Sequence, residues 1–127
     1  MTTDRRLSDL RKVANVLADQ ALGPVTRAAA KVRKIETRIA EIAAHREALI
    51  KSASDPSVAA TMLRQADRLR ETQAQALTQL AAARAEWEKA RHAAAQAVGR
   101  RQVLSELSKR RDVEEKRDAL RRRLRGD

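Results

Sequence analysis

The chain has 127 residues, of which 43% are hydrophobic and 35% charged, with a single aromatic residue and no cysteine. Sheet surfaces are built from aromatic and β-branched side chains, so a chain without Phe or Tyr has little with which to fill a sheet core. The absence of cysteine excludes a disulfide framework, a thiolate zinc site and a cysteine nucleophile. The predominance of Ala, Leu, Arg and Glu instead predicts long helices within one domain.

The charge balance favours acidic partners. Lys and Arg total 28 against 17 Asp and Glu, a formal net charge of +11, which suits nucleic acid, an anionic membrane or an acidic protein surface. Part of this bias can be genomic, because Arg and Ala both have GC-rich codons. The start of the chain, MTTDRRLSDLRKV, lacks the apolar stretch of a signal peptide, and no window has the length of a membrane span. We therefore expect a cytoplasmic protein that does not insert into a membrane.

The first predicted helix covers about residues 4–51. Its apolar residues recur in alternating steps of three and four, which is the spacing of a helix face that packs against a partner. Before the Gly23-Pro24 dipeptide these residues are Leu7, Leu10, Ala14, Leu17 and Ala21, and after it they are Val25, Ala28, Val32, Ile35, Ile39, Ile42 and Leu49, with Arg46 at the one intervening position. Because proline removes a backbone donor and clashes with the preceding turn, Gly23-Pro24 predicts a break in this helix.

A turn is predicted at about residues 52–56 and a second helix at about 57–125. The turn segment is rich in small polar residues, and Asp55 directly before Pro56 suits an N-cap followed by the first position of a helix. The second helix carries its own apolar seam at steps of three and four residues, with the polar residues Gln73 and Arg101 at two of its positions: Ala59, Met62, Ala66, Leu69, Ala76, Leu80, Ala83, Trp87, Ala90, Ala94, Ala97 and Leu104.

Two long amphipathic helices with a short connection predict an all-α fold, an antiparallel two-helix coiled-coil hairpin over residues 1–127. Counting back from the turn places Trp87 opposite Leu22, so that this side chain fills the gap at the Gly23-Pro24 break. The same count places the start of the chain, Met1, opposite about Ser108. Residues 109–127 are then predicted to project as a single helix end.

This projecting end reads KRRDVEEKRDALRRRLRGD and has no partner inside the hairpin. It supplies the predicted partner contacts, which are Arg110, Arg111, Arg117, Leu120, Arg121, Arg122, Arg123, Leu124 and Arg125. Structural roles are predicted for Trp87, Gly23, Pro24, Asp55 and Pro56. A solvated helix with internal salt bridges is the alternative reading of the same segment, because acidic residues interrupt its basic runs. Arginine runs can also follow the phosphates of nucleic acid, although no aromatic side chain in this segment could stack on bases.

Catalysis is not expected. The two histidines, His45 and His92, lie on different helices and do not meet, and no zinc-protease, nucleophile-elbow, phosphate-loop or EF-hand motif is present. A two-helix hairpin also offers no pocket that excludes water. We expect no catalytic residue, no metal, no cofactor and no small-molecule substrate.

Several segments together resemble a known family. They are Leu7-Ser8-Asp9-Leu10-Arg11-Lys12-Val13-Ala14 near the start, Trp87-Glu88-Lys89-Ala90-Arg91, the stretch Gly99-Arg100-Arg101-Gln102-Val103-Leu104-Ser105-Glu106-Leu107, and Glu114-Glu115-Lys116-Arg117. This arrangement resembles the FliJ family of flagellar type III export proteins and its YscO-type relatives in virulence systems. The resemblance implies a cytoplasmic two-helix stalk or escort factor for protein transport and flagellum biogenesis. Its implied partners are a hexameric export ATPase and the export gate protein.

Two other functions stay open on the sequence. One is a basic coiled coil that binds nucleic acid, and the other is a helical adaptor whose seam recruits a helix of another protein.

Overall fold

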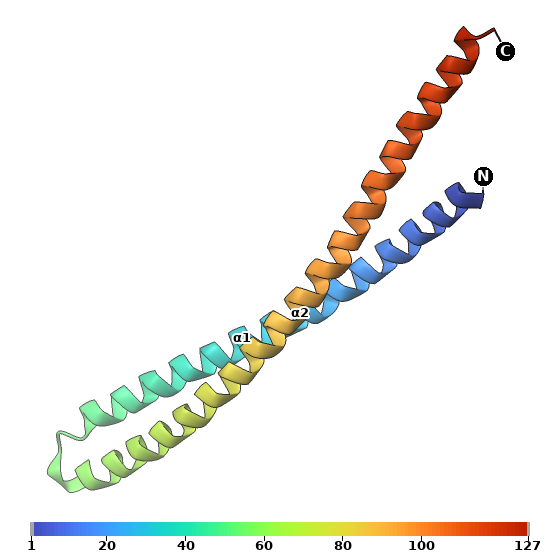
Figure 1. Ribbon diagram of the computed structural model, residues 1–127. Coiled ribbons are helices and arrows are strands. Elements are labelled where there is room, and N and C mark those ends of the chain that lie inside the picture. The colour runs from blue at the N-terminus through green and yellow to red at the C-terminus, as the bar shows by residue number, and fades with distance from the viewer. Residues whose placement is uncertain (1, 127) are drawn as a thin grey trace. The chain divides into compact units, whose positions relative to one another are not determined.

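The computed structural model describes residues 2–126, which form two antiparallel helices, α1 (Thr2–Ser52) and α2 (Pro56–Leu124) (Figure 1). No strand occurs within this described range. The predicted all-α, two-helix hairpin is confirmed. The described residues contain no helix long and apolar enough to cross a bilayer.

The turn between the helices is closed by backbone and side-chain capping. At the end of α1 the Ala53 N–H donates to the Leu49 carbonyl at 3.1 Å. Pro56 begins α2 without an N–H that needs a partner, and the preceding Asp55 caps the helix. One carboxylate oxygen of Asp55 accepts the Ser57 N–H at 3.0 Å and the Ser57 hydroxyl at 2.9 Å. These bonds satisfy donors that the first helical turn leaves open.

The cap makes the stability of the hairpin depend on pH. The two hydrogen bonds from Ser57 lower the pKa of Asp55 from its ordinary value of 3.8. A pKa that is lower in the folded state contributes stability above the unfolded value, and this stability is lost as the pH falls through the folded value. We expect Asp55→Ala to lower Tm at pH 7, and the gap between the variant and the parent chain to close in acid. Thermal melts monitored by circular dichroism at pH 7 and in acid measure the difference in Tm.

Asp55→Asn is the matched control, because asparagine caps helices about as well but does not titrate. At pH 7 its Tm should be close to that of the parent chain. The difference in Tm between Asp55→Asn and Asp55→Ala should stay the same in acid, because neither side chain titrates. Equal melting of all three chains at pH 7 would contradict a role for this cap.

The predicted break at Gly23-Pro24 is wrong, because α1 continues through Pro24 without interruption. Proline costs the helix one hydrogen bond, but its fixed φ is close to the helical value. The residue before a proline is normally pushed out of the helical region by a clash that involves its Cβ. Gly23 has no Cβ, so the helix can continue. The dipeptide does mark a boundary of another kind, because the chain divides here into two compact units.

The first of these, the turn unit, comprises Pro24–Ala90. Its core is a cluster of Val32, Leu80 and Ala83, against which Ile35, Ile39 and Trp87 pack partly buried. Two ion pairs link the helices beside this core: Lys31 Nζ to Glu86 Oε2 at 3.3 Å, and Arg84 Nη2 to Glu36 Oε1 at 3.5 Å.

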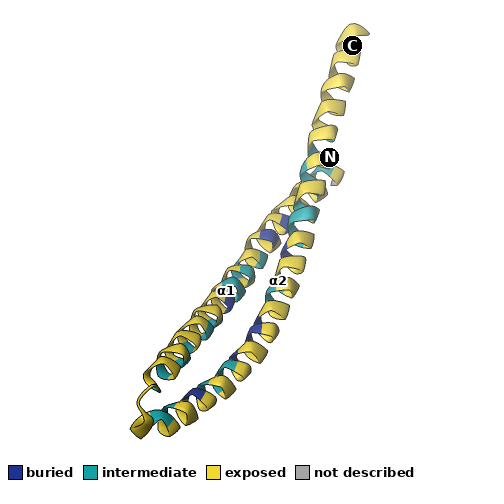
Figure 2. Cartoon of the chain, turned by 90° about the vertical axis from the view of Figure 1, so that its left-hand side faces the viewer, coloured by how far each residue is buried: buried dark blue, intermediate teal, exposed yellow. Residues whose placement is uncertain are grey.

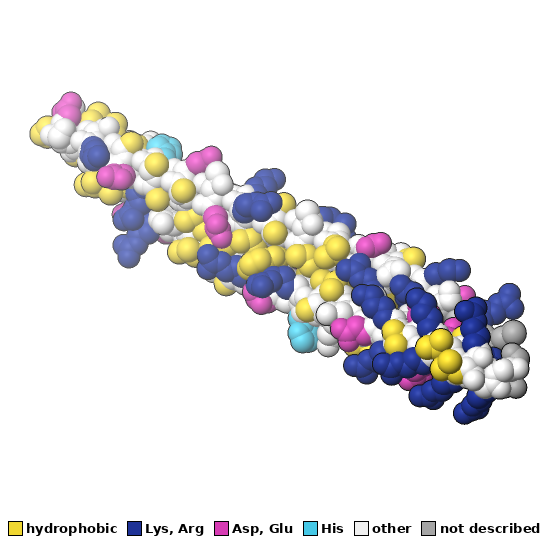
Figure 3. Space-filling model, turned by 90° about the horizontal axis from the view of Figure 1, so that it is seen from above, with side chains coloured by type: hydrophobic (Ala, Val, Ile, Leu, Met, Phe, Trp, Pro, Cys, Tyr) yellow, Lys and Arg dark blue, Asp and Glu magenta, His cyan; other side chains and the backbone are white. Residues whose placement is uncertain are grey.

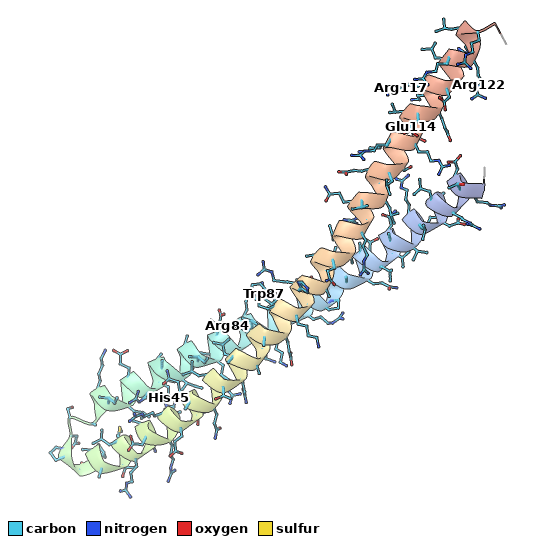
Figure 4. The ribbon with its side chains drawn as sticks, in the orientation of Figure 1. His45, Arg84, Trp87, Glu114, Arg117 and Arg122 are labelled. Carbon is cyan, nitrogen blue, oxygen red and sulfur yellow. The ribbon has the colours of Figure 1, made fainter. Side chains whose placement is uncertain are left out.

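Trp87 therefore has a packing role in the turn unit, although the gap that it was expected to fill does not exist. Its ring packs against the Val32 cluster, and the Trp87 side chain projects from the middle of α2 (Figure 4). Leu22 belongs to the other unit, so the predicted pairing of Trp87 with Leu22 stays a prediction.

The second unit, the terminal unit, comprises Met1–Gly23 and Arg91–Asp127. Ala14, Ala18 and Ala94 are its buried apolar residues. The predicted seam of α2 is correct here, with Ala97 and Leu104 partly buried, but the predicted seam of α1 is partly wrong. Leu10 and Leu17 are 54% and 48% exposed. Ala14 and Ala18 lie four residues apart on α1, and their small side chains let α2 approach closely. The larger Leu10 and Leu17 lie to one side of this contact.

Candidate functional site

The C-terminal turns of α2 are exposed to solvent. Every residue from 112 to 126 is exposed, as the run of yellow at the C-terminal end of Figure 2 shows. The predicted start of the projection at residue 109 is nevertheless wrong. Arg111 forms an ion pair with Asp4, and Arg11 donates a hydrogen bond to the Ser108 hydroxyl at 3.0 Å. Long side chains thus carry the pairing of the helices further than a count of facing Cα positions predicts.

The contacts between α1 and α2 end at Glu115. Its pKa is raised, first because its carboxyl shares a hydrogen bond with that of Asp4 and then because the negative charge of Asp4 opposes ionisation; Arg111 acts in the opposite direction. The contact between the two carboxyl groups is therefore strengthened when Glu115 is protonated. Residues 116–126, which follow it, are called the free end below.

Arginine and leucine side chains share the free end. Leu120 is 57% and Leu124 79% exposed, and they lie four residues apart on one face of the helix. Arg117 falls on the same face, three residues before Leu120. Arg117 and Arg122 point to different sides of the helix (Figure 4), and Lys and Arg side chains crowd this end of the molecule around a small apolar patch (Figure 3).

Asp118 holds two of these arginines. The Arg122 Nε donates to the Asp118 carbonyl at 3.3 Å, and Arg121 Nη1 lies 3.9 Å from Asp118 Oδ1. The ion pair is exposed, with both side chains about two-thirds accessible, and such pairs stabilise a helix only slightly. Its main effect is to orient part of the basic surface.

The structure separates the predicted contact residues into groups. The free end brings together Arg117, Leu120, Arg121, Arg122, Arg123, Leu124 and Arg125. Arg111 is engaged with Asp4, and Arg110 is exposed six residues before the free end begins. The residues with predicted structural roles lie elsewhere: Asp55 and Pro56 at the turn, Trp87 in the turn unit, and Gly23 and Pro24 at the unit boundary.

Sequence reasoning missed a second surface, an apolar groove in the terminal unit. Both helices line it, and the lining is almost wholly apolar: Leu10, Val13, Ala14 and Leu17 from α1 with Ala97, Gly99, Arg100, Val103 and Leu104 from α2. The signal for it was in the sequence. Val13 and Val103 lie outside the alternating repeat and widen the apolar face beyond what one partner helix covers.

Within the described residues, no group of three or more His, Cys, Asp or Glu side chains could hold a metal ion. His45 and His92 both lie on exposed parts of their helices, and His92 Nε2 is 3.3 Å from Gln96 Nε2. What the described side chains offer is therefore a basic helix end and an apolar groove, both suited to binding.

Comparison with protein-family models, curated proteins and solved structures gave no significant match.

Proposed function

We propose that this chain is a cytoplasmic stalk or escort component of a type III protein export apparatus, of the flagellar or the virulence kind. In this role it binds the ring of the hexameric export ATPase and the export gate protein. The observation that carries the proposal is the free end of α2, where exposed leucines and arginines share one helix without a partner on α1. The family resemblance of the sequence supports the same role.

The leucines favour a protein partner over a merely solvated helix. A helix that only interacts with water and with its own charges has no use for Leu120 and Leu124 at adjacent turns of one face. Fully burying a leucine side chain contributes about 1.5–3 kcal/mol. A ring pore with acidic loops and an apolar sleeve would use both kinds of side chain on this end.

The arginines alone would also suit nucleic acid, so the test separates the two contributions. One variant changes Arg121, Arg122 and Arg123 to Gln, and the other changes Leu120 and Leu124 to Ala. We expect both variants to lose binding to the ATPase ring, each by about tenfold or more, in a titration with the purified ring. Duplex DNA should bind weakly and should respond only to the arginine changes.

Matched controls come from the turn unit. Arg64, Arg68 and Arg70 changed to Gln give the same loss of charge on exposed positions of α2, and Leu63 and Leu77 changed to Ala remove leucines that are each 49% exposed. Both controls should bind the ring like the parent chain. Tight DNA binding that ignores the leucines, with log Kd changing by about 0.9 per phosphate contact for each tenfold change in salt, would favour the nucleic-acid function instead.

A further inference from the structure

The two flanks of the terminal unit differ in chemistry. One flank is ionic and links the helices at three places: Arg101 Nη1 to Asp19 Oδ1 at 3.6 Å, the hydrogen bond from Arg11 to Ser108, and the ion pair of Arg111 with Asp4. The other flank is the apolar groove. Polar contacts therefore hold the hairpin together along one flank, and the apolar side chains of the opposite flank are left at the surface.

The walls of the groove are unusually exposed for apolar side chains. Val13 and Val103 are each 56% exposed, and Leu10 and Leu17, which line the same groove from α1, are also about half exposed. Leu107, which is 46% exposed, continues the wall one turn beyond Val103. A Cβ built on Gly99 would meet nothing within 4 Å, so the groove stays open at this point of α2. An exposed, contiguous apolar patch of this kind marks an interaction site.

The shape of the groove suits a helix. Leu10, Val13 and Leu17 advance at steps of three and four residues, a length of about 10 Å along the axis of α1. A third helix laid along two antiparallel helices would place side chains at positions i, i+3 or i+4, and i+7 against both walls. An extended peptide would find few backbone partners there, because both neighbouring helices already satisfy their own backbone groups.

The charges around the groove decide what kind of helix fits. Arg100 lies in the lining itself, and Arg6 and Asp9 border the continuation of the groove past Leu10 and Val13. Arg110 follows Leu107 on the same side of α2, and it is exposed. The sequence of the terminal unit contains sixteen basic and nine acidic residues. A second copy would therefore bring like charge against this rim, whereas an acidic helix would be attracted to it.

We propose that the apolar groove binds an amphipathic helix of another protein, with an apolar stripe flanked by acidic residues. This surface is separate from the free end, and the inference does not rest on the proposed role in protein export. The apolar stripe of the partner would cover Leu10, Val13 and Val103, and its carboxylates would reach Arg6, Arg100 and Arg110.

The test uses a synthetic alanine-based helix of about 18 residues, long enough to be helical in water, with Leu at i, i+3 and i+7 and Glu beside them. A second peptide carries Lys in place of every Glu. We expect the acidic peptide to bind the full chain at least tenfold more tightly than the basic peptide at low salt, with the difference shrinking as salt is added. Fluorescence anisotropy of a dye on the peptide measures both affinities.

Val13→Asp should weaken binding of the acidic peptide at least tenfold. Val16→Asp is the matched control, because Val16 is the same residue type on the same helix, 53% exposed, and outside the groove lining. It should bind the acidic peptide like the parent chain. Circular dichroism of both variants verifies that each retains the hairpin.

Three outcomes would overturn the inference: no binding of either peptide, equal binding of both, or equal loss in the two valine variants. Sedimentation of the chain alone gives a fourth, since a dimer that Val13→Asp dissociates would assign the groove to a second copy. Binding to the ATPase ring is measured in parallel for the parent chain and for Val13→Asp. That measurement reports on the free end, so either proposal can fail without the other.

Discussion

A chain that ends at Arg117 folds into the same two-helix hairpin and loses binding to the ATPase ring by about a hundredfold or more. The deletion leaves the contacts of Arg111 and Glu115 with Asp4 in place and ends the helix on a basic residue, which the helix dipole favours. It removes Leu120 and Leu124, whose burial in a partner contributes about 3 kcal/mol together, equal to roughly a hundredfold in Kd. Thermal melts and ring titrations measure the two effects.

The melt is the control for this deletion. An unchanged Tm with lost binding supports the free end as the contact, because the residues removed take no part in the hairpin. A fall in Tm would mean that the free end packs on the rest of the chain. Full binding by the shortened chain would contradict the proposed role of residues 118–125.

Trp87→Ala should lower the free energy of unfolding by about 3 kcal/mol, the low end of the range for truncating a buried aromatic side chain. The indole is partly buried against Val32, Leu80 and Ala83, and alanine would leave most of its volume empty. Urea denaturation followed by circular dichroism measures the loss. Fluorescence would not serve, because Trp87 is the only tryptophan.

Two further variants show whether packing explains the loss. Trp87→Leu keeps part of the apolar volume and should lose less than Trp87→Ala. Leu77→Ala removes a side chain that is 49% exposed on the same helix, and it should change the stability only slightly. If Trp87→Ala unfolds at the same urea concentration as the parent chain, Trp87 does not hold the turn unit together.

The α2 helix was predictable from its sequence because one periodic signal dominates it. Each residue assigned to its seam, from Ala59 to Leu104, is buried or partly buried. The repeat runs through this segment with no proline after Pro56 and only Gly99 before Gly126. The Asp55-Pro56 signal placed the start of α2 to within one residue for a similar reason, since capping is decided locally.

The face of α1 in the terminal unit was less predictable, because two apolar faces compete there. Leu10 and Leu17 fit the alternating repeat, but so do alanines on the adjacent line, and Ala18 is fully buried. Periodicity cannot choose between them, since the choice depends on how closely α2 approaches. The sequence shows the extra apolar residues Val13 and Val103, but that they line a groove follows from the close approach of the helices, which only the packed structure gives.

Two further errors came from treating local features alone. Pro24 predicted a break because the rule for proline does not take into account a preceding residue without Cβ. The start of the free end was placed too early because the count ignored the reach of long side chains such as Arg111. In both cases the explanation lies in a residue of the sequence: Gly23 has no Cβ that clashes with Pro24, and Arg111 is long enough to reach Asp4.

Alanine makes up six of the eight buried side chains whose burial is described, alongside Val32 and Leu80. Small, identical side chains interlock much the same way if one helix slides along the other by a heptad, so they discriminate poorly between alignments. In the terminal unit, where Ala14, Ala18 and Ala94 are the buried side chains, alignment therefore depends more on cross-helix charges, such as Asp19 with Arg101 and Asp4 with Arg111. These pairs are solvent-accessible, and dissolved ions screen them. Raising the ionic strength should thus weaken the resistance of the helices in the terminal unit to slipping past each other.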